Sequence, residues 1–490
     1  MTAEATLSLA TIERHAIDYV PAPERHGTVR GQGVFWFLAN FHFLTIATGF
    51  IGPGMGLSFA WTMVASVAGL LFGTLFMAVH ASQGPTLGVP QMVQSRAQFG
   101  VRGVVVPLLG ALFNFLAFNV VETMLIDQGF NGMFGWNATA VGAGLAVVAF
   151  ALAVWGHDWL HLSFRVLFWI SLPMILVLTV ALFGGWVTLA VPPPAAGAAP
   201  VVLGWSAVAF AAQFTACAAF NLSYGPCVSD YTRYLSRERA TAGLIAAVYV
   251  GASASAIWLM ALGAWLAVRF GASDGLVALR DAGNALTPHF GEVLAIVSVL
   301  ILLATMGLNA YSAALTVITG IDSLRPLPPS RGVRIVTTLA MAVLWLGVAL
   351  SLNAGAIDAL FAALALMLYL LVPWSAINLV DYFLVRRKMI VVTDLFRADG
   401  VYGSWSARGL VSYCVGLLAS VPFWVVGTFW TGPLADRLGG VDIAWLVGLV
   451  VSGGLYGLLS RGYDPASERA AERASETILA GIDAGVAATR

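Results

Sequence analysis

The stretch FNLSYGPCVSDYTRYL, residues 220–235, decides how the rest of the chain is understood. It ends an apolar run that begins near Leu203, and it places Gly225 and Pro226 where a membrane helix would otherwise continue. Proline lacks an N–H and clashes with the preceding turn, and glycine weakens the helix, so backbone polar groups are freed here. At membrane depth, freed groups are tolerated only where they face a cavity, an ion or other protein. The polar and aromatic side chains at this break are Asn221, Ser223 and Tyr224.

A helix broken in this way has two interpretations. Transporters use broken helices with polar side chains at the fracture to hold a substrate near the middle of the bilayer. A proline kink whose freed groups are satisfied by neighbouring helices is the structural alternative. The rest of the sequence has to distinguish between them.

The composition excludes a soluble protein. The chain has 490 residues, of which 59% are hydrophobic and 10% charged, and its mean hydropathy is +0.87. Soluble domains carry about 25% charged residues. The net charge is zero, which gives no indication of a nucleic-acid partner, and three cysteines in apolar runs do not form a disulfide framework. The first 33 residues lack the apolar centre of a cleavable signal peptide. We therefore expect an all-α polytopic membrane protein.

Apolar runs long enough to cross a bilayer predict twelve transmembrane helices. They lie near 34–56, 59–80, 104–130, 138–156, 164–190, 203–228, 242–270, 291–320, 334–352, 356–384, 408–430 and 442–460. With both ends in the cytoplasm, only Arg269, Arg280 and Arg437 of the 24 Lys and Arg residues fall outside. This bias predicts that both termini are cytoplasmic.

The first and sixth predicted spans are both interrupted. The first is broken by Thr48-Gly49 and by Gly52-Pro53-Gly54. Interrupted helices in corresponding positions of two halves indicate an inverted repeat, here of five helices plus five with two extra helices. The predicted organisation is a cytoplasmic tail 1–33, repeats 34–190 and 203–384, two further helices 408–460 and a cytoplasmic tail 462–490, which we expect to include an amphipathic helix.

The third span contains an acidic residue at mid-membrane depth. Asn114, Phe118 and Glu122 recur at every fourth position and therefore share one helix face. A carboxylate there is costly unless it faces water, a partner or a ligand. Glu122 could accept hydrogen bonds from substrate N–H groups, carry a coupling proton, or pair with another side chain structurally.

The eighth span places Thr305 and Asn309 one turn apart. The Thr305 hydroxyl could ligate a hard cation together with carbonyls freed in the first span, and Asn309 offers both a donor and an acceptor. Ordinary hydrogen bonding between helices is the alternative for both. The sequence contains no metal-ligand cluster, nucleotide-binding motif or nucleophile–base pair. We therefore predict that the protein is not an enzyme and has no cofactor or metal.

Four segments carry a resemblance to a known family. They are SQGPTLGVPQMVQSRAQFG (82–100), DYTRYL (230–235), NAYSAAL in the eighth span and NLVDYFLVRR (378–387). They resemble the purine/cytosine permeases of the nucleobase:cation symporter-1 family. The resemblance implies a leucine-transporter-type fold and cation symport of a nucleobase or related heterocycle. It further implies that the ring stacks between aromatic side chains of helices 3 and 6, with amide and carboxyl groups reading its edge.

Carried onto this sequence, the resemblance gives Phe118 and Tyr224 as the stacking aromatics. Members of the family often have tryptophan at both positions, so Phe118 and Tyr224 each depart from the family's usual residue. Ala304 stands where sodium-coupled members carry a hydroxyl, which weakens a sodium site and favours a proton. The predicted substrate site comprises Gly49, Asn114, Phe118, Glu122, Asn221, Ser223, Tyr224, Gly225 and Asn309. The predicted cation site comprises Ala47, Ile301, Ala304 and Thr305.

The sequence thus predicts a secondary active transporter of the plasma membrane that imports a nucleobase of cytosine or purine type. Its predicted partners are a planar heterocycle, a coupling cation (H+ or Na+) and the lipid bilayer, with no protein partner evident. Allantoin, hydantoin or a vitamin-precursor pyrimidine are alternative substrates. An amino-acid permease of the same architecture and a membrane sensor without transport are less favoured. In the expected transport mechanism, spans 1, 2, 6 and 7 rock as a group against spans 3, 4, 8 and 9 around a central site.

Overall fold

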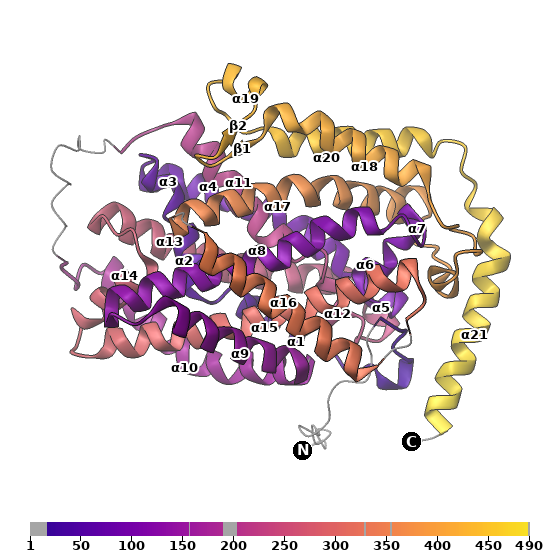
Figure 1. Ribbon diagram of the computed structural model, residues 1–490, viewed down its shortest axis with the longest axis horizontal. Coiled ribbons are helices and arrows are strands. Elements are labelled where there is room, and N and C mark those ends of the chain that lie inside the picture. The colour runs from indigo at the N-terminus through magenta and orange to yellow at the C-terminus, as the bar shows by residue number, and fades with distance from the viewer. Residues whose placement is uncertain (1–16, 156, 190–202, 328–329, 353–354, 489–490) are drawn as a thin grey trace.

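The computed structural model of the protein describes residues 17–155, 157–189, 203–327, 330–352 and 355–488. In these ranges the chain is mostly helical, and most long helices run side by side along one direction (Figure 1). Such an arrangement is expected of a bilayer-spanning chain, because a helix satisfies all of its backbone hydrogen bonds within itself.

Eight helices in the described residues are long and apolar enough to cross a membrane, and a bent pair forms a ninth span. The eight are α4 (Phe59–Ala81, continued to Leu87), α8 (Val105–Phe134), α9 (Ala138–Trp155), α10 (His157–Phe183), α13 (Ala242–Phe270), α15 (Phe290–Leu324), α16 (Arg331–Ser351) and α17 (Ala356–Leu379). Three shorter apolar helices are α11 (Ala207–Leu222), α18 (Ala407–Ser420) and α20 (Ala444–Leu459). Together these segments are consistent with the twelve predicted spans.

Shorter elements connect the spans. The short α-helices are α5 (Gln83–Leu87), α6 (Gln91–Gln94), α7 (Arg96–Phe99), α12 (Val228–Thr232), α14 (Gly275–Asn284) and α19 (Pro433–Arg437). The other helical turns are η1 (Ala22–Glu24), η2 (Arg237–Arg239), η3 (Val380–Val385, a π-helix), η4 (Val392–Phe396), η5 (Val421–Phe423) and η6 (Pro465–Glu468). Strands β1 (Val425–Val426) and β2 (Trp430–Thr431) pair antiparallel.

The first span is broken, and its sharpest bend precedes the predicted interruption at Thr48-Gly49. It consists of α1 (Val29–Ala39) followed by α2 (Phe43–Thr48) and α3 (Ile51–Gly54), and the two parts meet at 62°. The break therefore lies at residues 40–42. His42 adopts extended backbone angles there, and the Thr45 hydroxyl donates to the Asn40 carbonyl at 2.6 Å. The interruption predicted at Thr48-Gly49 is also present, since α2 ends at Thr48 and α3 begins at Ile51, whereas Gly52-Pro53-Gly54 lie within α3.

The break in the sixth span is confirmed. Helix α11 ends at Leu222, tight turns occupy residues 223–227, and α12 resumes at Val228. The Gly225 N–H donates to the Leu222 carbonyl at 2.7 Å, a shorter-range bond than an α-helix makes. Pro226 has no N–H to donate, so the regular hydrogen-bond pattern of the helix ends here.

Glycines allow the broken spans to pack closely on their neighbours. A Cβ built on Gly263 of α13 would lie 1.9 Å from the Ile46 carbonyl oxygen of α2, and one on Gly49 would lie 2.3 Å from the Met260 carbonyl of α13. Real Cβ atoms do not approach oxygen this closely, so the helices can meet only where a side chain is absent. Small residues at contacts of this kind are typical of packing between membrane helices.

Replacing Gly263 by alanine is expected to destabilise the protein by about 1–3 kcal/mol, because the added methyl forces α2 and α13 apart. Gly347 of α16 is the matched control, since a Cβ there meets nothing within 4 Å. In thermal unfolding of the purified variants, Gly263→Ala should have a lower midpoint than the wild type, and Gly347→Ala should not. Equal midpoints would contradict the packing role.

The C-terminal segment forms the predicted helix. Helix α21 (Arg469–Ala488) lies across the direction of the spans at the end of the molecule that carries α5, α6, α7 and α12 (Figure 1). Asp483 of α21 accepts a hydrogen bond from the Ala22 N–H at 2.8 Å, and the Ser475 hydroxyl accepts one from the Thr393 N–H at 3.2 Å. The tail is therefore docked on segments that precede the first span and follow α17.

Candidate functional site

The carboxyl group of Glu122 lies inside the molecule, between α8 and α15. Its side chain is fully buried, and its Oε2 accepts a hydrogen bond from the Asn309 amide at 3.4 Å. Its Oε1 has no hydrogen-bond partner among the described residues. The predicted neighbourhood of Glu122 and Asn309 is thus present in the structure. A buried carboxyl oxygen without a partner is costly, so this atom calls for a donor or a proton.

One turn before Phe118, Asn114 reaches the break of the sixth span. Its amide donates to the Ser223 carbonyl at 3.0 Å, which is one of the groups that the break releases from the helical pattern. The Asn114 Oδ1 is buried and has no partner in the described part of the chain. The face of α8 predicted from the sequence therefore presents two unused oxygens, one from Asn114 and one from Glu122.

Two aromatic rings meet beside this face. The Phe118 and Phe220 rings are perpendicular, with centroids 6.2 Å apart. His42, at the break of the first span, lies with its ring 6.3 Å from Phe220. Both His42 nitrogens are buried and make no hydrogen bond with the described residues, although the Ala39 carbonyl lies nearby. Apolar rings next to unused polar atoms are characteristic of a small-molecule site.

Sequence reasoning missed Phe220 and His42 as members of this group. Phe220 opens the stretch 220–235 and precedes Tyr224 by four residues, a spacing that places two residues on the same helix face and could have pointed to it. The Tyr224 ring instead packs against Trp36 at 5.2 Å, and its hydroxyl donates to the Ala39 carbonyl at 3.0 Å. The partner of Phe118 in the structure is therefore Phe220, and the Tyr224 hydroxyl is already engaged.

Four other predicted substrate residues have neighbours within the protein. The Asn221 side chain bonds to Asn40 and Thr74. A Cβ on Gly225 would lie 3.3 Å from the Trp374 ring, so Gly225 faces α17, and Gly49 faces α13. The Ser223 hydroxyl donates to the Phe220 carbonyl at 2.6 Å, which leaves its own carbonyl as the group near Asn114.

The four predicted cation residues have different surroundings. Thr305 is buried with its hydroxyl unpartnered in the described residues, and Ile301 precedes it by one turn. The Ala47 carbonyl accepts the Phe50 N–H at 3.0 Å in the turn that follows the end of α2. Ala304 lines a groove between α9 and α10 together with Leu152. In the part of the chain that the structure describes, no three His, Cys, Asp or Glu residues gather as metal ligands.

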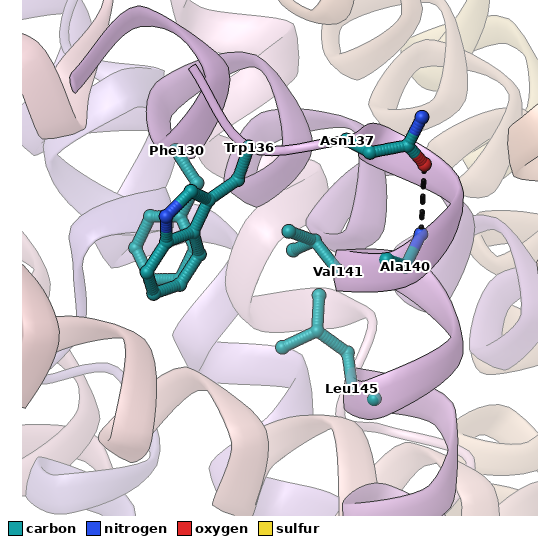
Figure 2. A pocket seen from close by; sticks show the side chains of 7 residues that line it. Phe130, Trp136, Asn137, Ala140, Val141 and Leu145 are labelled. Atoms are coloured by element: carbon teal, nitrogen blue, oxygen red, sulfur yellow. Dashed lines mark hydrogen bonds between the residues drawn. The ribbon is translucent and has the colours of Figure 1, made fainter. Parts of the chain in front are cut away.

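A surface groove lies elsewhere, at the ends of α8 and α9, and its volume is about 400 Å³. Phe130 and Trp136 form one wall and Val141 and Leu145 the other (Figure 2). The Asn137 side chain is its polar group, and Asn137 Oδ1 accepts the Ala140 N–H at 3.1 Å as a helix cap. This groove is apolar and open, as expected of a surface facing lipid.

Comparison with known proteins identifies the family. Residues 19–448 match the family model described as "Permease for cytosine/purines, uracil, thiamine, allantoin". The chain belongs to this family. It is the nucleobase:cation symporter-1 family predicted from the four sequence segments.

Other members of the nucleobase:cation symporter-1 family are similar over most or part of their length. A protein of Bacillus subtilis (strain 168) named "Putative purine-cytosine permease YxlA" is 33% identical over 459 residues, which cover 92% of this chain and 96% of that protein. The allantoin permease of the same organism is 29% identical over 107 residues, which are 22% of this chain and 21% of that one.

The fold is shared with a solved transporter of the nucleobase:cation symporter-1 family. Mhp1, in a closed conformation with bromovinylhydantoin bound, matches 95% of this chain and 100% of its own with a TM-score of 0.69 at 20% identity. Its inward-facing conformation matches with a TM-score of 0.64 at 19% identity. These matches confirm the predicted leucine-transporter-type fold.

Proposed function

We propose that this permease imports a nucleobase or a related planar heterocycle by symport with a cation. The observation that carries the proposal is the set of unused buried polar atoms around two aromatic rings. Glu122 Oε1, Asn114 Oδ1 and the His42 nitrogens have no partner in the described residues, and the Phe118 and Phe220 rings lie beside them. A nucleobase has two flat faces and a rim of hydrogen-bond donors and acceptors. The faces match the aromatic rings, and the rim matches the unused polar atoms.

The proposed roles follow from the chemistry of each group. Phe118 and Phe220 would hold the faces of the ring, and the Glu122 carboxyl would accept from ring N–H groups. Asn114 and Asn309 would complete the rim, and His42 could either donate or accept according to its tautomer. A site built in this way rejects analogues that leave its buried groups unpaired. An amino acid would bring its carboxylate next to that of Glu122, which disfavours this class of substrate.

For the coupling cation we propose a proton. Sodium needs a full shell of oxygens, and among the four predicted cation residues Thr305 alone carries a side-chain oxygen. Movement would follow the alternating-access scheme, in which cation and substrate stabilise an occluded state through higher affinity for it. The proposed location is the plasma membrane with both ends in the cytoplasm, on the basis of the Lys and Arg distribution.

Uptake of radiolabelled compounds tests the proposal. Cytosine, adenine, hypoxanthine, uracil, allantoin and hydantoin would be offered to cells that lack their own permeases, with and without sodium and a protonophore. We expect saturable uptake of a nucleobase that collapses with the protonophore and survives removal of sodium. If none of these compounds is taken up although the protein is present in the membrane, the proposal of a heterocyclic substrate would be refuted. Loss of uptake when sodium is removed would refute the proposal that the coupling cation is a proton.

A further inference from the structure

We propose that helix α21 is a strap that holds one end of the molecule closed, and that its C-terminal part must leave the segment before the first span for that end to open. This is the end that carries α5, α6, α7 and α12, which is proposed to be cytoplasmic (Figure 1). Four side chains of α21 recur at every fourth position and form the face that docks there. They are Ala471, Ser475, Leu479 and Asp483.

One docking site of α21 is the segment that precedes the first span. Asp483 accepts hydrogen bonds from the Ala22 N–H at 2.8 Å and from the Tyr19 hydroxyl at 3.4 Å. The Val20 N–H of the same segment donates to the Gly88 carbonyl at 2.9 Å, directly after α5. Because α5 continues the second span, this docking site is fixed to the second span.

The other docking site is η4, which follows α17. The Thr393 N–H of η4 donates to the Ser475 hydroxyl at 3.2 Å. The buried Arg96 guanidinium joins η4 to the eighth span, since it donates to the Leu395 carbonyl at 3.0 Å and to the Thr319 carbonyl of α15 at 3.1 Å. This docking site is therefore fixed to the eighth span.

An apolar cluster connects the two docking sites. Ile17 and Leu87 come from the side of the second span, and Ile318 and Val391 come from the side of the eighth span. Leu479 of α21 packs against this cluster. In alternating access the second and eighth spans belong to different groups, which move apart when the cytoplasmic end opens. A helix that is bonded to both sides has to leave one of them.

The C-terminal part of α21 is the part that can leave. Just before the helix, Glu468 of η6 bonds the buried Arg386, which anchors the start of α21 on the side of α17. Beyond this anchor, Ser475 is the one buried residue of α21. The Glu476 carboxylate pairs with Arg237, but both side chains are exposed, so this pair contributes little. Segments with few buried contacts open locally while the rest of the fold stays intact. The strap thus sets how readily the substrate site opens to the cytoplasm, a consequence that rests on the proposed function.

Two adjacent side chains of α21 provide a matched pair of variants. Leu479→Ser removes the contact with the apolar cluster, whereas Ile478→Ser changes a side chain that is 54% exposed. Spin labels at the exposed Glu238 of η2 and at the exposed Ala398 after η4 would report the opening, with the exposed Cys414 replaced by serine. In double electron–electron resonance, Leu479→Ser should raise the ratio of long to short distances by about 10-fold, the effect of losing one partly buried leucine contact. Ile478→Ser should leave the ratio unchanged.

A polar pair of variants tests the same detachment. Asp483→Ala removes the acceptor of both bonds to the N-terminal segment and should also raise the ratio of long to short distances. Thr477→Ala is its control, because the Thr477 hydroxyl donates to the Arg473 carbonyl of its own helix. An unchanged ratio in both Leu479→Ser and Asp483→Ala would overturn the proposal. These distances need no substrate, so they remain decisive if no base is transported.

Two cross-links distinguish detachment from simple stabilisation. In a Cys414→Ser background, a short bismaleimide would join Ala22→Cys to Ala484→Cys and so tether the C-terminal part of α21 to the N-terminal segment. A second cross-link would join Thr393→Cys to Ala474→Cys, on the side that stays docked. The first cross-link should abolish uptake of the transported base, and the second should leave uptake unchanged. Equal effects of the two cross-links would overturn the proposal.

Discussion

Glu122→Gln is expected to reduce uptake of the transported base by about 10- to 100-fold, because a hydrogen bond to a charged group contributes about 1.5–3 kcal/mol. Glutamine keeps the shape of the side chain and can still accept from the Asn309 amide, which bonds Glu122 Oε2. It carries no charge and takes up no proton. The substitution therefore removes the acceptor that the substrate rim would use and leaves the packing of α8 against α15 intact.

The control is Glu476→Gln on α21, whose carboxylate pairs with Arg237 on the surface. It should transport like the wild type, since exposed ion pairs contribute about 0–1 kcal/mol. Initial rates of uptake at several pH values and substrate concentrations would separate a binding defect from a coupling defect. If Glu122→Gln kept the wild-type rate, affinity and dependence on protonophore, Glu122 would have neither of the proposed roles.

The sequence allowed the spans and one break to be predicted because glycine and proline mark them directly. Pro226 ends the regular helix in the sixth span. The first break has no such mark, since Asn40, Phe41 and His42 are ordinary residues for a helix to contain. Gly49 lies in the second interruption, between α2 and α3, and it also lets α13 approach closely. Glycine in a membrane helix can indicate either a break or a close contact, and the sequence alone does not distinguish them.

The candidate site was predictable on α8 and α15 but not at the breaks. Regular helices fix which residues share a face, so Asn114, Phe118 and Glu122 could be grouped, and Glu122 is bonded to Asn309 in the structure. Past the end of α11 the backbone turns irregularly, and helical periodicity no longer indicates which way a side chain points. Tyr224 was predicted to stack on a bound ring together with Phe118, whereas the proximity of the Phe220 ring, 6.2 Å from that of Phe118, was not predicted.

Arg386→Met is expected to destabilise the folded protein by about 3–5 kcal/mol, because it leaves buried carboxylates without their counter-charge. Arg386 follows η3 and is 3% exposed. Its Nε donates to Asp381 at 3.1 Å, and its Nη1 bonds the Glu468 carboxylate. Burial alone would lower the pKa of Arg386, but the Asp381 carboxylate, together with Tyr402 and Glu468, raises it above its usual value.

The matched control for this prediction is Arg397→Met. Arg397 pairs with Asp399 at 3.1 Å, but the two side chains are 61% and 78% exposed, so the loss should be below about 1 kcal/mol. The triple variant Asp381→Asn, Arg386→Met and Glu468→Gln should recover most of the stability, since it removes the uncompensated charges. Unfolding of the purified proteins by denaturant would measure all three. Equal losses for the two arginines would contradict a structural role of the buried cluster.

The measurement that tests the central claim most directly is equilibrium binding of the nucleobase panel to the purified protein. Phe220→Ala would be compared with Trp136→Ala, because Trp136 lines the apolar groove at the ends of α8 and α9. Stacking of a base on an aromatic ring contributes about 1–3 kcal/mol, so Phe220→Ala should raise the Kd of the bound base by about 5- to 150-fold. Trp136→Ala should leave the Kd unchanged. A raised Kd in Trp136→Ala with wild-type binding in Phe220→Ala would place the ligand in the surface groove and contradict a substrate site between the broken helices.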